Sequence, residues 1–249
     1  MNSGEHGGFI DLHCHVLPMV DDGPSKWDEA MDMFRQASES GTSTIIATPH
    51  GDSRGRWEKI ESLEQICLEL NKALKQEQIP LNLLLGMEVP LELNTVERVK
   101  NRTALTLNGS AYILVELPFL QLPLYWEEAL FQMQMGGLKP IIAHPERQAQ
   151  LSKNPNLMAG VVGRGVLGQL TAGSLVGEFG PDTKKSAEIL LRRGLVHVIA
   201  SDAHRARQAR STDIRPGLKA AIKIVGQEQA DNMTSGLPFE ISRPSPKPA

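Results

Sequence analysis

The chain has 249 residues, of which 41% are hydrophobic, and its formal net charge is −3. This length and composition suit one large core, and the scattered Lys and Arg residues argue against nucleic acid or an anionic membrane surface as a partner. The chain has two cysteines, a polar N-terminus and no long apolar run. We therefore expect a cytoplasmic protein that has no disulfide framework and no membrane insertion.

The chain is predicted to form a single domain over residues 1–241, followed by a tail over residues 242–249. The tail reads S-R-P-S-P-K-P-A, a composition typical of disordered or polyproline-like segments. The sequence leaves the oligomeric state open.

Short apolar runs alternate with amphipathic segments along the domain. The first helix is predicted to begin at Ser25, which would form a capping box with Asp28, and to end at Gly41. Further helices are predicted over residues 60–75, 126–135, 182–193 and 216–225. A weaker strand is predicted around Val166. Six other apolar runs, read as strands, end at the polar residues His13, His50, Glu88, Glu116, His144 and Asp202.

Continuous apolar strands that alternate with helices predict an α/β fold with a parallel sheet covered by helices. In such folds ligands bind at the carboxyl ends of the strands, where this sequence has its polar residues. A closed barrel would bring the six strand ends around one mouth. Buried charges need partners, and metal ions bind carboxylates and imidazoles together, so these strand ends indicate a metal site.

The stretch from Asp11 to Gly23, D-L-H-C-H-V-L-P-M-V-D-D-G, carries a dense group of polar residues. His13 and His15 are two positions apart, so on a strand both imidazoles point to the same face and can reach one ion. Cys14 points to the opposite face and is predicted to be a core residue. The H-x-H pattern is weak alone, and the other strand ends strengthen it.

The chain offers nine candidate metal ligands: His13, His15, Asp22, His50, Glu88, Glu116, His144, Asp202 and His204. This set has no cysteine and suits manganese, iron or zinc rather than a structural thiolate zinc site. Nine ligands exceed the need of one ion, so we predict two or three divalent transition metals, which suit attack of a metal-bound hydroxide on phosphorus. The thiol-phosphatase mechanism is excluded, because it needs an Arg six positions after the Cys, where Val20 and Ala73 stand here.

The motifs D-L-H-C-H, A-T-P-H, G-M-E, V-E-L, A-H-P-E-R and A-S-D-A-H, in this order, resemble those of the PHP (polymerase and histidinol phosphatase) superfamily. Within it the chain most resembles the bacterial metal-dependent protein-tyrosine phosphatases of capsule and exopolysaccharide loci. The resemblance implies a distorted (β/α) barrel that holds three metals, manganese first, at the carboxyl ends of its strands. It also implies a phosphotyrosine protein as substrate, and regulation of capsule or exopolysaccharide synthesis through a bacterial tyrosine kinase.

Carried over motif by motif, the resemblance implies three groups of ligands. One metal would take His13, His15, Glu88 and Asp202. A second would share Glu88 and add Glu116 and His144. The third would take His50, His204 and a carboxylate of the D-D pair, for which we prefer Asp22 to Asp21.

The resemblance also implies the residues that handle phosphate. Arg147 of A-H-P-E-R would bind it through its planar guanidinium. Relatives carry a second Arg, closely followed by proline, just after D-x-H; here the stretch is R-A-R-Q-A-R-S-T, and we prefer Arg210, then Arg207. His204 or Asp22 would protonate the leaving phenolate. A further departure is Gly51, where many relatives have a second His or Arg after T-P-H.

The main alternative is a small-molecule phosphomonoesterase such as histidinol phosphatase, which has similar metals. The D-D-G motif and Glu116 favour the tyrosine phosphatases. An amidohydrolase usually needs a metal-bridging Lys at a strand end, which no predicted strand provides, and a non-catalytic metal-binding module would have lost a ligand. His197 is expected to be packed or hydrogen-bonded rather than a ligand, and Glu146 to be a supporting or surface residue.

Overall fold

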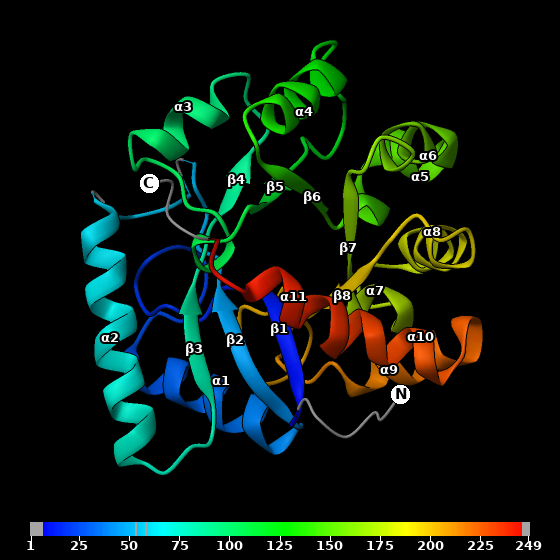
Figure 1. Ribbon diagram of the computed structural model, residues 1–249. Helices are drawn as coiled ribbons and strands as arrows, with labels where there is room; N and C mark the ends of the chain where they lie inside the picture. The colour runs from blue at the N-terminus through cyan, green and yellow to red at the C-terminus, as the bar shows by residue number, and fades with distance from the viewer. Residues whose placement is uncertain (1–6, 53, 58, 246–249) are drawn as a thin grey trace.

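The computed structural model describes residues 7–52, 54–57 and 59–245 and contains two parallel sheets surrounded by helices (Figure 1). Neighbouring strands within each sheet pair in parallel. The first sheet has the order β1 (Phe9–Cys14), β2 (Thr42–Ala47) and β3 (Asn82–Leu85). The second has the order β4 (Glu88–Pro90), β5 (Tyr112–Glu116), β6 (Lys139–Ala143), β7 (Leu167–Thr171) and β8 (Val198–Ala200).

Two bridges beyond the strand ends join the sheets into a ring. Cys14 pairs with Ala203, which connects β1 to the chain after β8, and His50 pairs with Glu88, which connects the chain after β2 to β4. The backbone N–H of His15 also donates to the Ala203 carbonyl oxygen at 2.8 Å. Cys14, Ala203 and His50 lie at or just after the carboxyl ends of their strands, and Glu88 begins β4. The predicted distorted α/β barrel is therefore confirmed.

The single strand that we predicted to end at Glu88 is in fact two strands. β3 ends at Leu85 in the first sheet, whereas Glu88 begins β4 in the second. The chain crosses between the sheets at Gly86, where an added Cβ would lie 2.9 Å from a side-chain atom of Leu107 and 3.0 Å from one of Ile46. A side chain does not fit this crossing without displacing the packing around it. An apolar run alone does not reveal such a change of partner.

Helices cover the outside of the ring (Figure 1). They are α1 (Trp27–Glu39), α2 (Ile60–Gln76), α3 (Thr95–Lys100), α4 (Trp126–Met135), α5 (Ala149–Lys153), α6 (Pro155–Val162), α7 (Ala172–Val176), α8 (Pro181–Arg192) and α9 (Arg215–Val225), with the short turns η1 (Leu107–Gly109) and η2 (Pro145–Arg147). The predicted range of α4 is confirmed, and those of α2, α8 and α9 are correct to within one residue at each end.

The predicted capping box of the first helix is wrong. Lys26 precedes α1 and provides no side-chain cap. Ser25 instead donates from its backbone N–H and its Oγ to Glu29 Oε2, at 2.8 and 2.9 Å. Ser25 thus holds the first turn of the helix through a residue one position beyond the one that we predicted.

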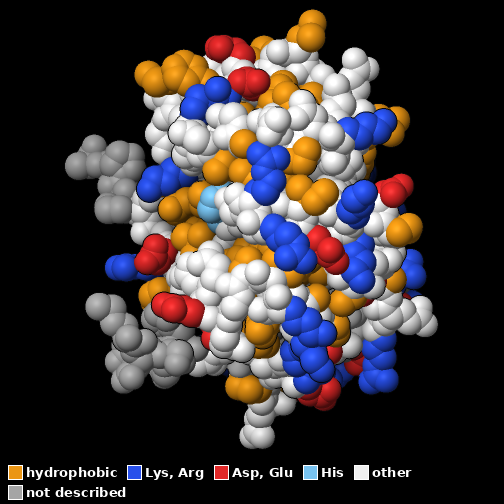
Figure 2. Space-filling view, turned by 90° about the vertical axis from the view of Figure 1, so that its right-hand side faces the viewer, with side chains coloured by type: hydrophobic (Ala, Val, Ile, Leu, Met, Phe, Trp, Pro, Cys, Tyr) orange, Lys and Arg blue, Asp and Glu red, His pale blue; other side chains and the backbone are white. Residues whose placement is uncertain are grey.

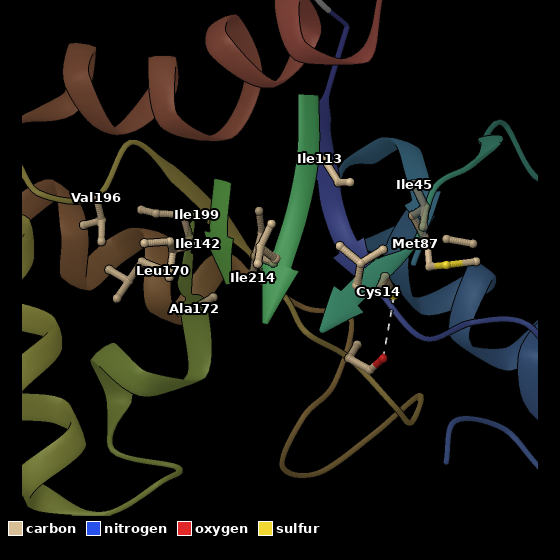
Figure 3. Close-up of a cluster of buried hydrophobic side chains, with 14 of the residues drawn as sticks. Cys14, Ile45, Met87, Ile113, Ile142, Leu170, Ala172, Val196, Ile199 and Ile214 are labelled. Carbon is tan, nitrogen blue, oxygen red and sulfur yellow. Dashed lines mark hydrogen bonds between the residues drawn. The ribbon is translucent and has the colours of Figure 1, made fainter. Parts of the chain in front are cut away.

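The apolar core has two parts, one on each side of the barrel wall. The inner part gathers side chains from strands around the ring, including Leu12, Ile46, Leu114 and Val198. The outer part lies between the strands and the helices, and Figure 3 shows some of its members. Cys14 is fully buried there, with its Sγ 3.9 Å from the Ala203 carbonyl oxygen. The prediction that Cys14 is a core residue is confirmed.

The C-terminal segment closes the amino-terminal end of the barrel, which we did not predict. After α9 the chain forms α10 (Gln227–Asp231), the π-helical turn η3 (Asn232–Gly236) and α11 (Leu237–Ser242). Ile241 of α11 is fully buried in the inner core, and Ser235 Oγ donates to the carbonyl oxygen of Gly8, just before β1.

The predicted tail boundary at residue 242 is wrong. Ser242 is the last residue of α11, and the backbone N–H of Ser245 donates to the Gly109 carbonyl oxygen at 3.1 Å. Residues 246–249, the rest of the predicted tail, lie outside the described residues.

The described surface carries mixed charge. On the face shown in Figure 2, Lys and Arg side chains are interspersed with acidic and apolar ones, in keeping with their scatter along the sequence. None of the helices in the described ranges has the length and apolar character of a membrane span.

We predict that Ile241→Ala destabilises the barrel, because truncating a fully buried Ile removes apolar contacts and leaves a cavity. The expected loss in the free energy of unfolding, measured by urea denaturation, is about 2–5 kcal/mol. Glu240→Ala, at an exposed position of the same helix, should change it by less than about 0.5 kcal/mol. Equal stability of the two variants would show that α11 does not hold the barrel closed.

Candidate metal centre

The nine candidate ligands meet at the carboxyl ends of the strands. Eight of them are buried and Asp22 is exposed. Each histidine of the set has an imidazole nitrogen within 3.8 Å of a carboxylate oxygen of another candidate ligand. Each Asp or Glu of the set has a carboxylate oxygen within the same distance of such an imidazole nitrogen. The fold therefore gathers into one cluster residues that the sequence spreads from position 13 to position 204.

A bulge in β1 allows its side chains to serve both the core and the cluster. Asp11 pairs with Ile45 but Cys14 pairs with Ala47, so β1 has one extra residue between these pairs. The extra residue shifts the alternation of side chains. Leu12 consequently lies in the inner core while His13 still reaches the cluster.

Asp11 holds this bulge in place. Its Oδ1 accepts from the backbone N–H groups of Ser201 at 3.0 Å and of His13 at 3.3 Å, and its Oδ2 accepts from Ser201 Oγ at 2.5 Å. Burial raises the pKa of Asp11, and these hydrogen bonds, which lower it, offset only part of that effect. This role of Asp11 was not predicted from the sequence.

Both histidines of the first motif are oriented by hydrogen bonds to their outer nitrogens. His13 Nδ1 lies 2.9 Å from Gln169 Oε1, and His15 Nδ1 lies 2.7 Å from Asp21 Oδ2. Gln169 Oε1 also accepts from the backbone N–H of His144 at 3.2 Å, which fixes the orientation of its amide. Hydrogen bonds of this kind fix the tautomer and orientation of metal-binding histidines.

The other nitrogens of these two rings face each other. His13 Nε2 and His15 Nε2 lie 3.2 Å apart. Burial opposes protonation of His15, but hydrogen bonds to Asp21 and Glu88 outweigh it and raise its pKa to about 10. The cluster thus favours positive charge at this position, which protons or metal ions can supply.

Glu88 lies at the centre of the cluster. Its Oε1 is 2.9 Å from His144 Nε2 and 3.4 Å from His13 Nε2. Its Oε2 is 2.9 Å from His50 Nδ1 and 3.5 Å from His15 Nε2. Burial would raise the pKa of Glu88, but the surrounding imidazoles hold it well below its usual range. Each carboxylate oxygen therefore faces two different histidines.

Asp22, rather than Asp21, belongs to the cluster. Asp22 Oδ1 lies 3.0 Å from His204 Nε2 and 3.3 Å from His50 Nε2. Hydrogen bonds with His204 and His50 hold the pKa of Asp22 far below its usual range. Asp21 instead supports His15. Gly23 completes this turn, because a Cβ there would lie 2.4 Å from the His15 carbonyl oxygen.

Two of the candidate ligands have backbone conformations that L-residues rarely adopt. His144 has φ 33° and Asp202 has φ 50°, in the left-handed region. Both residues follow the ends of strands, β6 and β8. His and Asp occur there more often than most residues, and such strain gathers at functional sites.

The residues present fit transition-metal ions. Three overlapping groups place one ligand atom per residue within 4.8 Å of one another: His15, Asp22, His50 and His204; His13, His15 and Glu88; His50, Glu88 and Glu116. Buried His50 Nδ1 and Glu88 Oε2 lie 2.9 Å from each other, so an imidazole nitrogen and a carboxylate oxygen converge away from solvent. Converging imidazole and carboxylate atoms in a set without sulfur suit manganese, iron or zinc.

These groups differ in part from those that the resemblance implied. His15 lies with Asp22, His50 and His204 as well as with His13, and His50 lies with Glu88 and Glu116. His144 approaches Glu88 at 2.9 Å and Glu116 at 3.8 Å. Seven of the nine candidate ligands occur in these three groups, and the other two, His144 and Asp202, lie 2.9 Å from Glu88 and 3.5 Å from His13.

Two arginines lie at the cluster, on the two oxygens of Asp202. Arg147 Nη1 donates to Oδ2 at 2.7 Å, and Arg210 Nη2 donates to Oδ1 at 3.0 Å. Arg210 Nη2 also lies 2.9 Å from His204 Nε2. The side chain of Arg207 is exposed, so the structure places Arg210 rather than Arg207 beside the candidate ligands.

Sequence reasoning missed Arg54. Its Nη1 donates to Glu116 Oε1 at 3.1 Å, its Nη2 also contacts Glu116 Oε2, and its Nε donates to Asp52. Arg54 and Glu116 are 62 positions apart, so no local pattern could have paired them.

Two residues that we had set aside lie outside the cluster. Glu146 is buried and accepts from Ser174 Oγ at 2.7 Å and from the backbone N–H of Thr171 at 3.0 Å. The supporting role is therefore favoured over the surface one. His197 Nδ1 accepts from the backbone N–H of Gly168 at 3.1 Å, so the prediction that His197 is hydrogen-bonded is confirmed.

Comparisons with known proteins agree with this geometry. The sequence model of a family described as "Capsular polysaccharide synthesis, CpsB/CapC" matches residues 9–241. The tyrosine-protein phosphatase YwqE of Bacillus subtilis (strain 168) is 38% identical over 199 residues, which cover 80% of this chain and 78% of YwqE. The putative tyrosine-protein phosphatase CapC of Staphylococcus aureus is 35% identical over 196 residues, covering 79% of this chain and 77% of CapC.

Solved structures show two levels of similarity. A structure from work on YwqE of Bacillus subtilis and CpsB of Streptococcus pneumoniae, described as unique metal-dependent tyrosine phosphatases, matches with a TM-score of 0.89 and 35% identity over 95% of both chains. The β-aspartyl dipeptidase of Fervidobacterium islandicum AW-1 matches with a TM-score of 0.59 and 16% identity over 95% of this chain and 72% of that one, which shows a shared fold alone. The chain therefore belongs to the CpsB/CapC family of capsular polysaccharide synthesis, the family that its motifs predicted.

Proposed function

We propose that this protein is a metal-dependent tyrosine phosphatase that hydrolyses phosphotyrosine in a protein substrate. The names of its relatives YwqE and CapC and the description of the matching structure support this activity. The link of the family to capsular polysaccharide synthesis supports a role in capsule or exopolysaccharide synthesis. A bacterial tyrosine kinase would be the partner whose phosphorylation the enzyme reverses.

The observation that carries this proposal is the pair of facing imidazole nitrogens. His13 Nε2 and His15 Nε2 lie 3.2 Å apart, and the Nδ1 atom of each ring already contacts an oxygen acceptor. Two nitrogen lone pairs at this distance repel each other unless a proton or a metal cation lies between or beside them. Glu88 and Asp202, 3.4 and 3.5 Å from His13 Nε2, supply negative charge that would hold such a cation.

We propose two or three divalent ions, with manganese as the first choice and iron or zinc as alternatives. Their ligands would be His13, His15, Asp22, His50, Glu88, Glu116, His144, Asp202 and His204. Glu88 would bridge two ions, because each of its oxygens faces a different pair of histidines. When bound, the ions would lower the pKa of a water molecule and offset the charge on the phosphate oxygens.

Arg147 and Arg210 would bind the phosphate oxygens. Both guanidinium groups point at Asp202, and among the described residues the side chain of Arg147 makes a hydrogen bond only through Nη1. A guanidinium has five N–H donors, so Arg147 keeps donors for a ligand. Charge on the phosphoryl oxygens redistributes as the bond to phenolate breaks, and fixed donors stabilise that charge.

His204 is better placed to be a ligand than to donate a proton. His204 Nδ1 lies 3.1 Å from the carbonyl oxygen of Asp202, which only accepts, so Nδ1 carries the proton and Nε2 presents its lone pair to the cluster. The proton for the leaving phenolate would then come from solvent. A cavity of about 400 Å³ opens beside Asp22 and His204 and gives water and substrate access to this side of the cluster.

The function is tested with metal-loaded protein and three substrates: a phosphotyrosine peptide, its phosphoserine counterpart and histidinol phosphate. We expect kcat/KM to be at least about tenfold higher for the phosphotyrosine peptide than for either other substrate, because phenolate, whose conjugate acid has a pKa of about 10, is a better leaving group than an alkoxide. Preference for histidinol phosphate would support the small-molecule alternative. Turnover of none of the three would refute phosphatase activity.

Glu88→Gln should remove at least one of the bound ions, because it removes the charge at the centre of the cluster. Elemental analysis of protein purified without chelator should find two or three transition-metal ions in the parent chain and at least one fewer in the variant. Glu69→Gln, at an exposed position on α2, provides the control with unchanged content. A full set of ions in Glu88→Gln would show that Glu88 is not a bridging ligand.

Arg147→Lys should impair turnover while metal content stays normal, because it keeps the charge and loses the planar fork. We expect kcat/KM on the phosphotyrosine peptide to fall by about tenfold to a thousandfold, a loss of about 1.5–4 kcal/mol of transition-state stabilisation. Arg207→Lys, which changes an exposed arginine in the same way, should keep the parent rate. Parent kinetics in both Arg147→Lys and Arg147→Ala would place the phosphate away from Arg147.

A further inference from the structure

The guanidinium of Arg147 lies between two aromatic rings. Its Cζ is 4.9 Å from the ring centroid of Phe119 and 4.4 Å from that of Phe179. Both distances fall within the range of about 6 Å in which a cation is attracted to an aromatic face. Phe119 follows β5 and Phe179 lies between α7 and α8, so the two rings reach Arg147 from separate parts of the chain.

Both rings belong to segments that are tied to the rest of the site. The ring of Phe119 stacks on that of His144, with centroids 5.4 Å apart and an interplanar angle of 17°. The carbonyl oxygen of Phe119 accepts from the backbone N–H of Ala149, two residues after Arg147, at 2.8 Å. Next to Phe179, the side chain of Glu178 accepts from the backbone N–H of Arg210 at 2.9 Å. These hydrogen bonds link the segment of Phe119 to that of Arg147 and the segment of Phe179 to that of Arg210.

We infer that Phe119 and Phe179 are positioning residues that clamp the guanidinium plane of Arg147 for phosphate. This inference rests on the proposed function of the site. The side chain of Arg147 has a hydrogen bond only to Asp202 among the described residues, and one such bond leaves a long, flexible side chain free to turn. Ring faces hold the plane without occupying the strong N–H donors, which stay available at the edge for the phosphate oxygens.

A merely structural role for the rings makes a different prediction. Phe119 is 36% exposed and Phe179 is partly exposed, so loss of either ring should leave the fold intact. If the rings only cover the surface, their loss would not change phosphate binding. If they clamp Arg147, their loss acts only where Arg147 is present. Phe179 is the cleaner test, because Phe119 also contacts His144.

The experiment compares Phe179→Leu, which loses the aromatic face, with Phe179→Tyr, which keeps it. In metal-loaded protein, Phe179→Leu should lower kcat/KM on the phosphotyrosine peptide and weaken binding of inorganic phosphate, each by about 3- to 30-fold. Phe179→Tyr should stay near the parent values, and metal content should be unchanged in both. Phe131→Leu, which changes a Phe on α4 that is 51% exposed, is the matched control.

The same substitution made in Arg147→Ala protein distinguishes a clamp on Arg147 from a merely structural role of the rings. There Phe179→Leu should cause no further loss in kcat/KM or in phosphate affinity, because the group that it positions is gone. An equal loss with and without Arg147, or no loss in Phe179→Leu alone, would overturn the clamp. Failure of the proposed function would appear separately, as absent turnover in the parent protein. Phosphate binding, measured by calorimetry, would still test the clamp in that case.

Discussion

The buried carboxylate of Glu88 is the constraint on which the rest of this structure depends. A charge that is only 2% exposed is costly unless partners surround it. Four imidazoles, those of His13, His15, His50 and His144, lie within 3.5 Å of its two oxygens. They come from β1, the end of β2 and the end of β6, so these strands must end around one point. The closed ring is the solution that satisfies this requirement.

The ring alone does not orient the side chains, and a second layer of residues does so. Gln169 and Asp21 hold the outer nitrogens of His13 and His15, and Asp11 holds the bulge from which both histidines project. Such partners fix the tautomer of a ligand and so the direction of its lone pair. This layer makes the cluster a set of converging donors rather than a group of nearby polar residues.

The residues that stabilise the barrel and the residues of the candidate site lie in different parts of it along the barrel axis. Apolar side chains fill the interior, and α11 closes the amino-terminal end with Ile241. The candidate ligands gather towards the carboxyl end, where Arg147 and Arg210 reach the cluster from turns beyond the strands. A distant dipeptidase shares the fold at 16% identity. The barrel is thus a scaffold, and the activity depends on which residues end its strands.

The sequence by itself determined the parallel α/β class, the ranges of four helices to within one residue and the nine residues that form the cluster, because periodicity and strand ends are local properties of a chain. It failed where partners are distant. The break between β3 and β4, the closing helix α11 and the contact of Arg54 with Glu116 each depend on which strands become neighbours. The motif resemblance already favoured Asp22 over Asp21 and Arg210 over Arg207, but only the tertiary structure placed Asp22 and Arg210 beside the cluster, because the closed ring fixes which of several adjacent or similar residues faces it.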